Sequence, residues 1–200
     1  MATKTFSNLD KPVQLVSIVG DNGDGTSSNS STVFLPPASV QGGTFNRPAD
    51  TVAYAAGDLI ANSVTAGSVV PITIAAARVA DRPFRGRRLR LKVTNPTGWK
   101  GIVVRAHLFR NSPVVMVGDN GVFNTAESYA CAEADYIGYQ DITLTQAFSD
   151  YAKGFAVGVD FISTPSPGTV NIFALLEARS AVTTPGSGTT FMLNLEVLRD

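Results

Sequence analysis

The sequence predicts an all-β protein: a jelly-roll-like antiparallel β-sandwich with at most one short helix and an extended N-terminal arm. Its 200 residues are 44% hydrophobic, which is enough for one substantial core. Its 18 glycines and 11 prolines are spread along the chain, as turns are between short strands. About ten short extended stretches follow one another at the spacing typical of a sandwich.

We divide the chain into an N-terminal arm, residues 1–12, and a single β-sandwich domain, residues 13–200. The arm is polar and ends at Lys11 and Pro12, so we expect order there only where a partner holds it. A hairpin loop at 183–188 should join the last two strands. Outside the basic segment described below, the predicted strands are 13–19, 32–35, 40–46, 52–54, 59–61, 68–75, 113–117, 136–144, 155–162, 169–178 and 190–198.

Residues 124–135 are the one good candidate for a helix. Asn124 can cap its N-terminus, and Glu127 follows at the spacing of a capping box. We expect a short helix here, within an otherwise extended chain.

The segment from Arg85 to Phe109 predicts an antiparallel hairpin whose turn is rich in Asn, Pro and Gly. In its first strand Leu89, Leu91 and Val93 share an apolar face, and the cations between them share the opposite face. In its second strand the even-numbered residues from Ile102 to Leu108 share the apolar face. We therefore expect one side of the hairpin to face the core.

Charge is divided unevenly along the chain. The 16 basic and 16 acidic side chains cancel, which argues against a surface tuned as a whole to nucleic acid. Residues 1–110 nevertheless carry a net charge of +7, and residues 111–200 carry −7. We expect the halves to attract each other, within one fold or between subunits, and simple mixing of both signs over one surface is the alternative.

The sequence does not predict an enzyme, a cofactor or a metal site. His107 is the only histidine available as a base, no Gly-x-Ser-x-Gly elbow surrounds a serine, and we interpret His107 as a hydrogen-bonded structural residue. Cys131 is the only cysteine; its acidic neighbours should raise a thiol pKa, and we expect a small core residue. The histidine, the cysteine and the scattered carboxylates lack metal-ligand spacing.

A basic run is the most distinctive feature of the chain. Binding to DNA phosphates is one interpretation, and six such contacts predict a slope of about −5 for log K against log salt. The run lacks interleaved aromatic residues, so we favour a surface that binds partner carboxylates and expect no nucleic-acid partner. The candidate contact residues are Arg82, Arg85, Arg87, Arg88, Arg90 and Lys92.

Several stretches of the chain are similar to one family. They are residues 45–63, 104–109, 118–123, 134–138, 175–179 and 191–200. These stretches resemble small virion structural proteins of tailed bacteriophages, of the kind that coat or cement the head. Residues 1–44 carry no part of the resemblance.

The resemblance implies a capsid decoration, or cement, protein that binds the head surface at capsomer junctions and stabilises the shell. Its partners would be the major capsid protein and further copies of itself, as a dimer or trimer. It would be made in the host cytoplasm and reside on the virion head, with no enzymatic activity. We expect the Arg82 to Lys92 face and the N-terminal arm to make the contacts.

Two other functions fit the sequence. One is a neck, tail or fibre-base component of the virion. The other is a receptor- or glycan-binding module in which exposed Tyr54, Trp99 and Tyr139 stack on sugars, with core packing as the simpler interpretation of each ring. The chain has no secretory signal and no apolar run of about 18 residues, so we expect a soluble protein with no membrane partner.

Overall fold

The computed structural model of the chain describes residues 20–21, 27–28, 38–123, 128–156 and 158–199. The chain divides into two compact units, Met1–Pro36 and Pro37–Asp200. In the first unit β1 (Gly20–Asp21) and β2 (Ser27–Ser28) pair antiparallel. The predicted arm at 1–12, the predicted domain start at residue 13, and the predicted strands at 13–19 and 32–35 lie outside the described residues.

The second unit confirms the all-β prediction. Its described helical elements are α1 (Pro96–Trp99) and a 3₁₀ turn at Glu133–Asp135. Its strands are β3 (Ala38–Asn46), β4 (Leu59–Ile60), β5 (Ile72–Ile74), β6 (Phe84–Thr94), β7 (Val103–Phe109), β8 (Val114–Val115), β9 (Tyr129–Ala130), β10 (Tyr136–Ala147), β11 (Tyr151–Phe155), β12 (Phe161–Ser163), β13 (Ile172–Ala178) and β14 (Thr190–Arg199).

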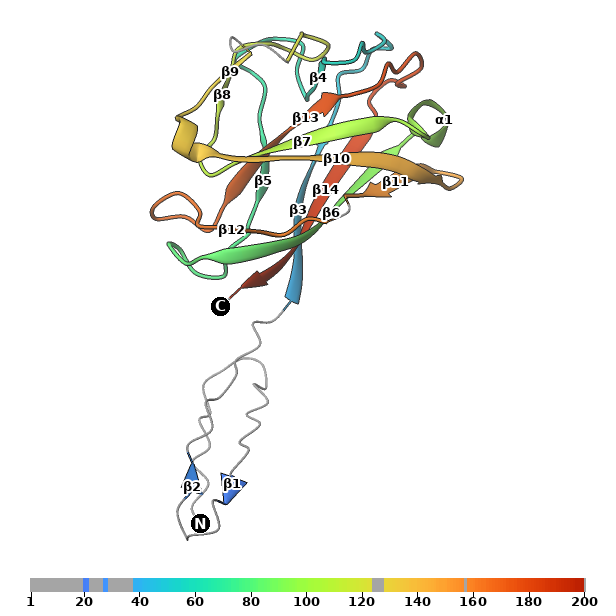
Figure 1. Ribbon diagram of the computed structural model, residues 1–200. Coiled ribbons are helices and arrows are strands. Elements are labelled where there is room, and N and C mark those ends of the chain that lie inside the picture. The colour runs from blue at the N-terminus through green and yellow to red at the C-terminus, as the bar shows by residue number, and fades with distance from the viewer. Residues whose placement is uncertain (1–19, 22–26, 29–37, 124–127, 157, 200) are drawn as a thin grey trace. The chain divides into compact units, whose positions relative to one another are not determined.

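Most of these strands form one antiparallel sheet with the order β3-β14-β6-β11-β10-β7-β13-β4, to which β12 adds beside β6 and β5 beside β13. The sheet curls on itself, so that β3, β14 and β6 form one layer and β7, β10 and β13 cross in front of them (Figure 1). The main core lies inside the curl, where alternate residues of β6, β7, β13 and β14 are buried. The jelly-roll topology stays a prediction.

Two predicted hairpins are wrong. β6 pairs with β14, β11 and β12, whereas β7 pairs with β10 and β13. β13 and β14 are likewise apart in the sheet, because β14 lies between β3 and β6. The chain between β6 and β7 crosses from one layer to the other. It passes through α1, whose fully buried Trp99 inserts at the end of the core. The Trp99 ring packs edge-on against Phe191 with centroids 4.8 Å apart, and its Nε1 donates to the carbonyl of Pro185 at 2.9 Å.

The helix predicted over 124–135 is wrong for residues 128–135, and residues 124–127 lie outside the described part of the chain. Tyr129 belongs to β9, and the 3₁₀ turn follows. Tyr129 and Cys131 both pack against a second apolar cluster, and a spacing of two residues is that of a strand. Burial of these side chains overrides the capping signal.

That second cluster covers the outer face of β7 and β13 at one end. Phe109 of β7 and Leu175 of β13 point into it, while their neighbours along each strand point into the main core. The rings of Tyr129 and Phe123 each lie 5.3 Å from a neighbouring ring of the cluster. This end of the sheet is therefore buried on both faces. The buried members of the cluster are Leu59, Ala61, Val69, Phe109, Val115, Phe123 and Leu175.

A buried ionic network ties several loops to the sheet. The side chains of Arg47 and Asp119 are both 0% exposed. Arg47 Nε donates to the Tyr54 hydroxyl at 2.9 Å, and that hydroxyl donates to Asp119 Oδ1 at 2.8 Å. Burial, aided by the Asp119 carboxylate, raises the pKa of Tyr54, so the hydroxyl keeps its proton. The backbone N–H of Ala61 and the carbonyl of Gly186 complete the network at 2.7 and 2.8 Å.

We expect Tyr54→Phe to lower the free energy of unfolding by about 1–3 kcal/mol, because it leaves Arg47 Nε and Asp119 each short of a buried hydrogen bond. Urea unfolding followed by tryptophan fluorescence measures the change. The matched control, Tyr139→Phe, removes a hydroxyl from a residue that is 50% exposed and should change stability by less than about 0.5 kcal/mol. Equal effects of the two substitutions would contradict the role given to the network.

We also expect Gly154→Ala in β11 to destabilise the fold by about 1–3 kcal/mol, since the added methyl group meets the backbone carbonyl oxygen of Thr143. Backbone atoms of β10 must then move away from β11. Thermal unfolding by circular dichroism measures the effect, with Thr145→Ala on the exposed side of β10 as the control. A Gly154→Ala variant as stable as wild type would show that β10 and β11 need not lie this close.

Candidate interaction surface

A β-bulge gathers the predicted cations of β6 on the outer face of the sheet. β14 has no residue opposite Arg87, because the register passes directly from Arg88 to Gly86. Arg87 and Arg88 are consequently both exposed, whereas strict alternation would turn one of them inward. Arg82 is exposed in the segment before β6. The outer face therefore carries all the cations of β6, which are Arg85, Arg87, Arg88, Arg90 and Lys92.

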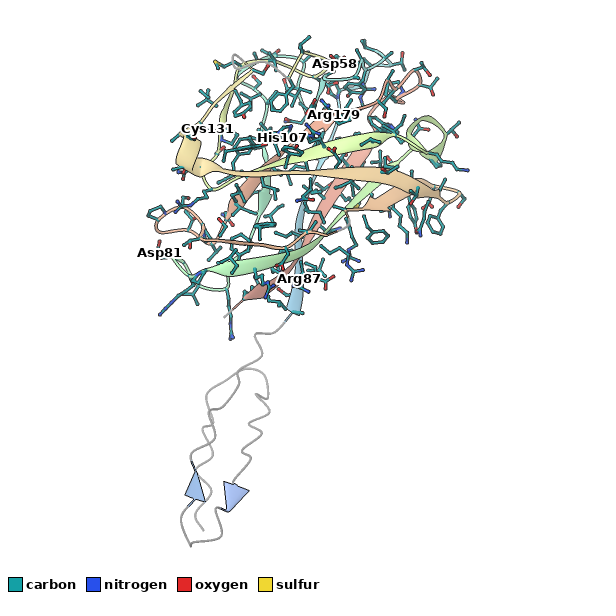
Figure 2. All side chains as sticks on the ribbon, in the orientation of Figure 1. Asp58, Asp81, Arg87, His107, Cys131 and Arg179 are labelled. Carbon is teal, nitrogen blue, oxygen red and sulfur yellow. The ribbon has the colours of Figure 1, made fainter. Side chains whose placement is uncertain are left out.

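Asp160 neutralises the first part of this face. Arg85 donates from Nε and Nη2 to the two carboxylate oxygens of Asp160 at 2.6 Å each, and Arg87 Nη1 lies 3.5 Å from the same carboxylate. The hydrogen bonds from Arg85 lower the pKa of Asp160. Figure 2 labels Arg87 on this part of the sheet, away from His107 and Arg179.

Glu196 of β14 pairs with the next cation along β6. Arg88 donates from Nε and Nη2 to Glu196 Oε2 at 3.0 and 2.8 Å. Elsewhere Arg105 of β7 makes a comparable pair with Asp141 of β10, at 2.7 and 2.9 Å. In each of these pairs a cation from residues 1–110 meets a carboxylate from residues 111–200. The predicted attraction between the halves thus operates within one fold.

The last two cations of β6 border a shallow groove of about 200 Å³ between β6 and β11. Lys92 Nζ lies 4.1 Å from the centroid of the Tyr151 ring. Lys153 Nζ lies 4.8 Å from the centroid of the Phe148 ring, which stacks on Tyr151. The groove thus combines cations with aromatic rings. Its polar and aromatic lining is Arg90, Lys92, Tyr151, Lys153, Phe155 and Asn194.

Sequence reasoning found only part of this groove. Of the predicted contact residues, Arg90 and Lys92 line it, whereas Tyr151, Lys153 and Phe155 were not predicted. A signal for these three exists, because they alternate with two small residues in the run from Tyr151 to Phe155 and so share one strand face. Their place beside β6 depends on strand pairing, which that alternation does not specify.

His107 belongs to a separate cluster on β7, where it is hydrogen-bonded as predicted; its purely structural role stays a prediction. Its Nδ1 lies 2.9 Å from the Tyr136 hydroxyl, and its Nε2 lies 2.9 Å from Glu177 Oε2. Arg179 donates to the other oxygen of Glu177 at 2.6 Å. Figure 2 labels His107 and Arg179 close together in this region. Burial opposes ionisation of Glu177, but the hydrogen bonds from His107 and Arg179 outweigh it and lower its pKa.

Two of the three aromatic residues proposed for sugar stacking are not available for it. Tyr54 is 2% and Trp99 0% exposed, so both rings belong to the core. Tyr139 is exposed, but the Arg105 guanidinium lies 3.9 Å from its ring centroid and covers one face. Cys131 is partly buried against the second cluster, and burial, followed by the nearby Asp135 carboxylate, raises its pKa as predicted.

Within the described ranges, no group of three or more His, Cys, Asp or Glu side chains is placed to hold a metal ion. Among the same residues, no helix has the length and apolar character needed to cross a membrane. A comparison of the chain with known protein families finds no match, and a comparison with curated proteins finds no significant match.

The Glu177 cluster generates a pH-dependent prediction. Because the folded pKa of Glu177 lies below its ordinary value of 4.5, its ionisation stabilises the fold above that pH. This contribution is lost as the pH falls through the lowered folded value. We expect Glu177→Gln to cost about 1–3 kcal/mol at neutral pH and to make stability less sensitive to acid.

Urea unfolding of wild type and variant at several pH values from neutral to about 3 measures this difference. Glu196→Gln is the control, because it removes a carboxylate from a more exposed ion pair and should cost under about 1 kcal/mol. Parallel pH profiles for wild type and Glu177→Gln would show that the cluster does not couple folding to protonation.

Proposed function

We propose that this protein is a structural component of tailed-bacteriophage virions, a decoration protein that binds the head surface at capsomer junctions and stabilises the shell. The observation that carries the proposal is the outer face of β6, where a bulge collects five cations on a rigid sheet. The resemblance of residues 45–63 and 191–200 to virion proteins supports the class. The proposed partners are the major capsid protein and further copies of this chain, as a dimer or trimer, without nucleic acid or cofactor.

The physical reasoning for a protein partner rests on the chemistry of arginine. Its planar guanidinium binds a carboxylate through two parallel hydrogen bonds, which fixes orientation as well as attraction. Arg85 and Arg88 already show this affinity by pairing with carboxylates of the same chain. Arg85 and Arg88 are therefore occupied by carboxylates of the same chain, and the remaining cations of this face are left to bind an external partner.

An apolar contact adjoins the cations. Ile162 of β12 is 74% exposed and lies opposite Arg85 in the β12–β6 pair. A stable interface buries on the order of 1,200 Å² or more, so the cations alone are too small an area and apolar contacts must contribute. Ile162 is the natural centre of such a contact, with charged residues at its rim.

The second proposal is a neck, tail or fibre-base location in the same virion, since the same cationic surface could bind a protein partner there. Copy number distinguishes the two. Many copies distributed over the particle support the head, and a few copies at one vertex support the neck or tail. The glycan-binding alternative keeps only Tyr139 of its three rings, because Tyr54 and Trp99 are buried.

The decisive experiment adds purified protein to phage heads that lack it. We expect wild type to co-sediment with the heads and to raise their resistance to heat and low salt. The double variant Arg87→Glu/Ile162→Glu should bind at least about tenfold more weakly, because it loses an exposed cation and the adjacent apolar contact. Lys100→Glu reverses the charge of an exposed cation at the end of α1; it is the control and should bind as wild type does.

The proposal fails if wild type does not bind the heads. It also fails if heads lacking the protein survive heat and low salt as well as complete heads. Equal binding by wild type and the double variant would show that the contact with the head lies on another surface of the protein.

A further inference from the structure

Rows of side chains cross β14 and β6 on the outer face, and β14 supplies a carboxylate to only one of the cationic rows. In that row Glu196 of β14 lies opposite Arg88 and pairs with it. In the next row the residue opposite Arg90 is Asn194, which has a similar polar shape but no charge. The sheet thus repeats the geometry of an arginine–carboxylate pair with the carboxylate missing.

The row beyond holds two like charges. Lys92 of β6 lies directly opposite Lys153 of β11, and such a pair destabilises a sheet. The residues on the far sides of this pair are Met192 and Gln146, which supply no negative charge. Within the described part of the chain, no ion pair reaches Arg90, Lys92 or Lys153. The fold therefore retains a repulsion that an anion from outside would relieve.

Arg90 also has an unmet hydrogen-bonding group. Its Nε is buried and has no hydrogen-bond partner in the described structure. A buried charged donor without an acceptor costs free energy, and Arg90 lines the groove. An acceptor that reaches this donor would satisfy it.

The rings beside the groove favour a carboxylate-bearing partner over nucleic acid. Bases bind single-strand sites by stacking on open aromatic faces. Here Lys92 covers a face of Tyr151, and Lys153 lies over Phe148 at 4.8 Å and over Phe155 at 5.8 Å. The rings thus hold the ammonium groups in place and leave the cations, not the rings, to meet a ligand.

We infer that the groove between β6 and β11 binds an acidic polypeptide segment in extended conformation, with carboxylates that meet Arg90, Lys92 and Lys153. Arg90 and Lys92 are two residues apart on one strand, about 7 Å, which matches acidic side chains at every second residue of an extended peptide. This inference deepens the proposed function by naming the chemistry of the partner, but its argument uses only this surface.

The test measures binding of the full chain to a fluorescent peptide of alternating glutamate and alanine, about ten residues long. A labelled oligothymidylate of similar length is the competing probe. We expect wild type to bind the peptide more tightly than the oligonucleotide. The double variant Lys92→Gln/Lys153→Gln should bind the peptide roughly tenfold more weakly, since it loses two charge-assisted contacts.

Asn194→Asp is the sharpest variant. It places a carboxylate beside Arg90, as Glu196 lies beside Arg88, and so supplies inside the chain what the ligand would bring. We expect it to raise the thermal midpoint and at the same time to weaken peptide binding. A residue with a merely structural role would not move the two readouts in opposite directions. Lys100→Gln is the control, because Lys100 lies outside the groove and its loss should leave peptide binding unchanged.

The inference is overturned if wild type does not bind the peptide, if Lys100→Gln weakens binding as much as the lysine double variant, or if the oligonucleotide binds more tightly. Peptide binding without head binding would refute the proposed function alone. Head binding without peptide binding would refute this inference alone.

Discussion

The buried ionic network around Arg47 holds one end of the sheet together. A buried cation is stable only when its hydrogen bonds are complete, and Arg47 completes them with nearby Asp50 and Tyr54 and with Asp119 and the Gly186 carbonyl from distant segments. The Tyr54 ring lies 5.8 Å from the Trp99 ring, so the same network positions the residue that closes the main core. The loops at this end are therefore fixed relative to one another by charge as well as by apolar packing.

The arrangement of side chains on the outer face of β6 depends on the packing of the inner face. Gly86, Leu89, Leu91 and Val93 are buried, and small residues of β11 face the same side, so the backbones of β6, β11 and β10 lie close together. With the interior fixed in this way, the long polar side chains of β6 and β11 point outward. The groove is thus a product of core packing, and its cations cannot turn inward to escape one another.

The sequence predicted many of the strands because each is a local pattern, as the alternation along Phe84–Thr94 illustrates. The predicted strand at 155–162 is wrong, since it joins the end of β11 to the start of β12, and residues 52–54 form no strand. Pairing was mispredicted, since β6 takes β14 as a neighbour and the nearby β7 does not pair with it. The cations of the site were identified, but the aromatic residues beside them come from β11, whose place depends on pairing. The adjacent Arg87 and Arg88 break the alternation and carried a signal for the bulge. The capping motif at Asn124 led to a wrong helix prediction for residues 128–135, because a capping motif carries no information on the burial of Tyr129 and Cys131.

The position of β14 in the sheet has a consequence for how the chain folds. β14 is the last strand in the described sequence, yet it lies between β3 and β6 and contributes alternate residues from Phe191 to Val197 to the main core. The core layer cannot close until this strand has been synthesised. Strand pairs so distant in sequence also make folding slow, because a long loop must be ordered before they form. Until β14 is synthesised, the edge of β6 that pairs with it stays unpaired. We expect that the chain must be completed quickly, because incomplete chains could associate with one another through this edge.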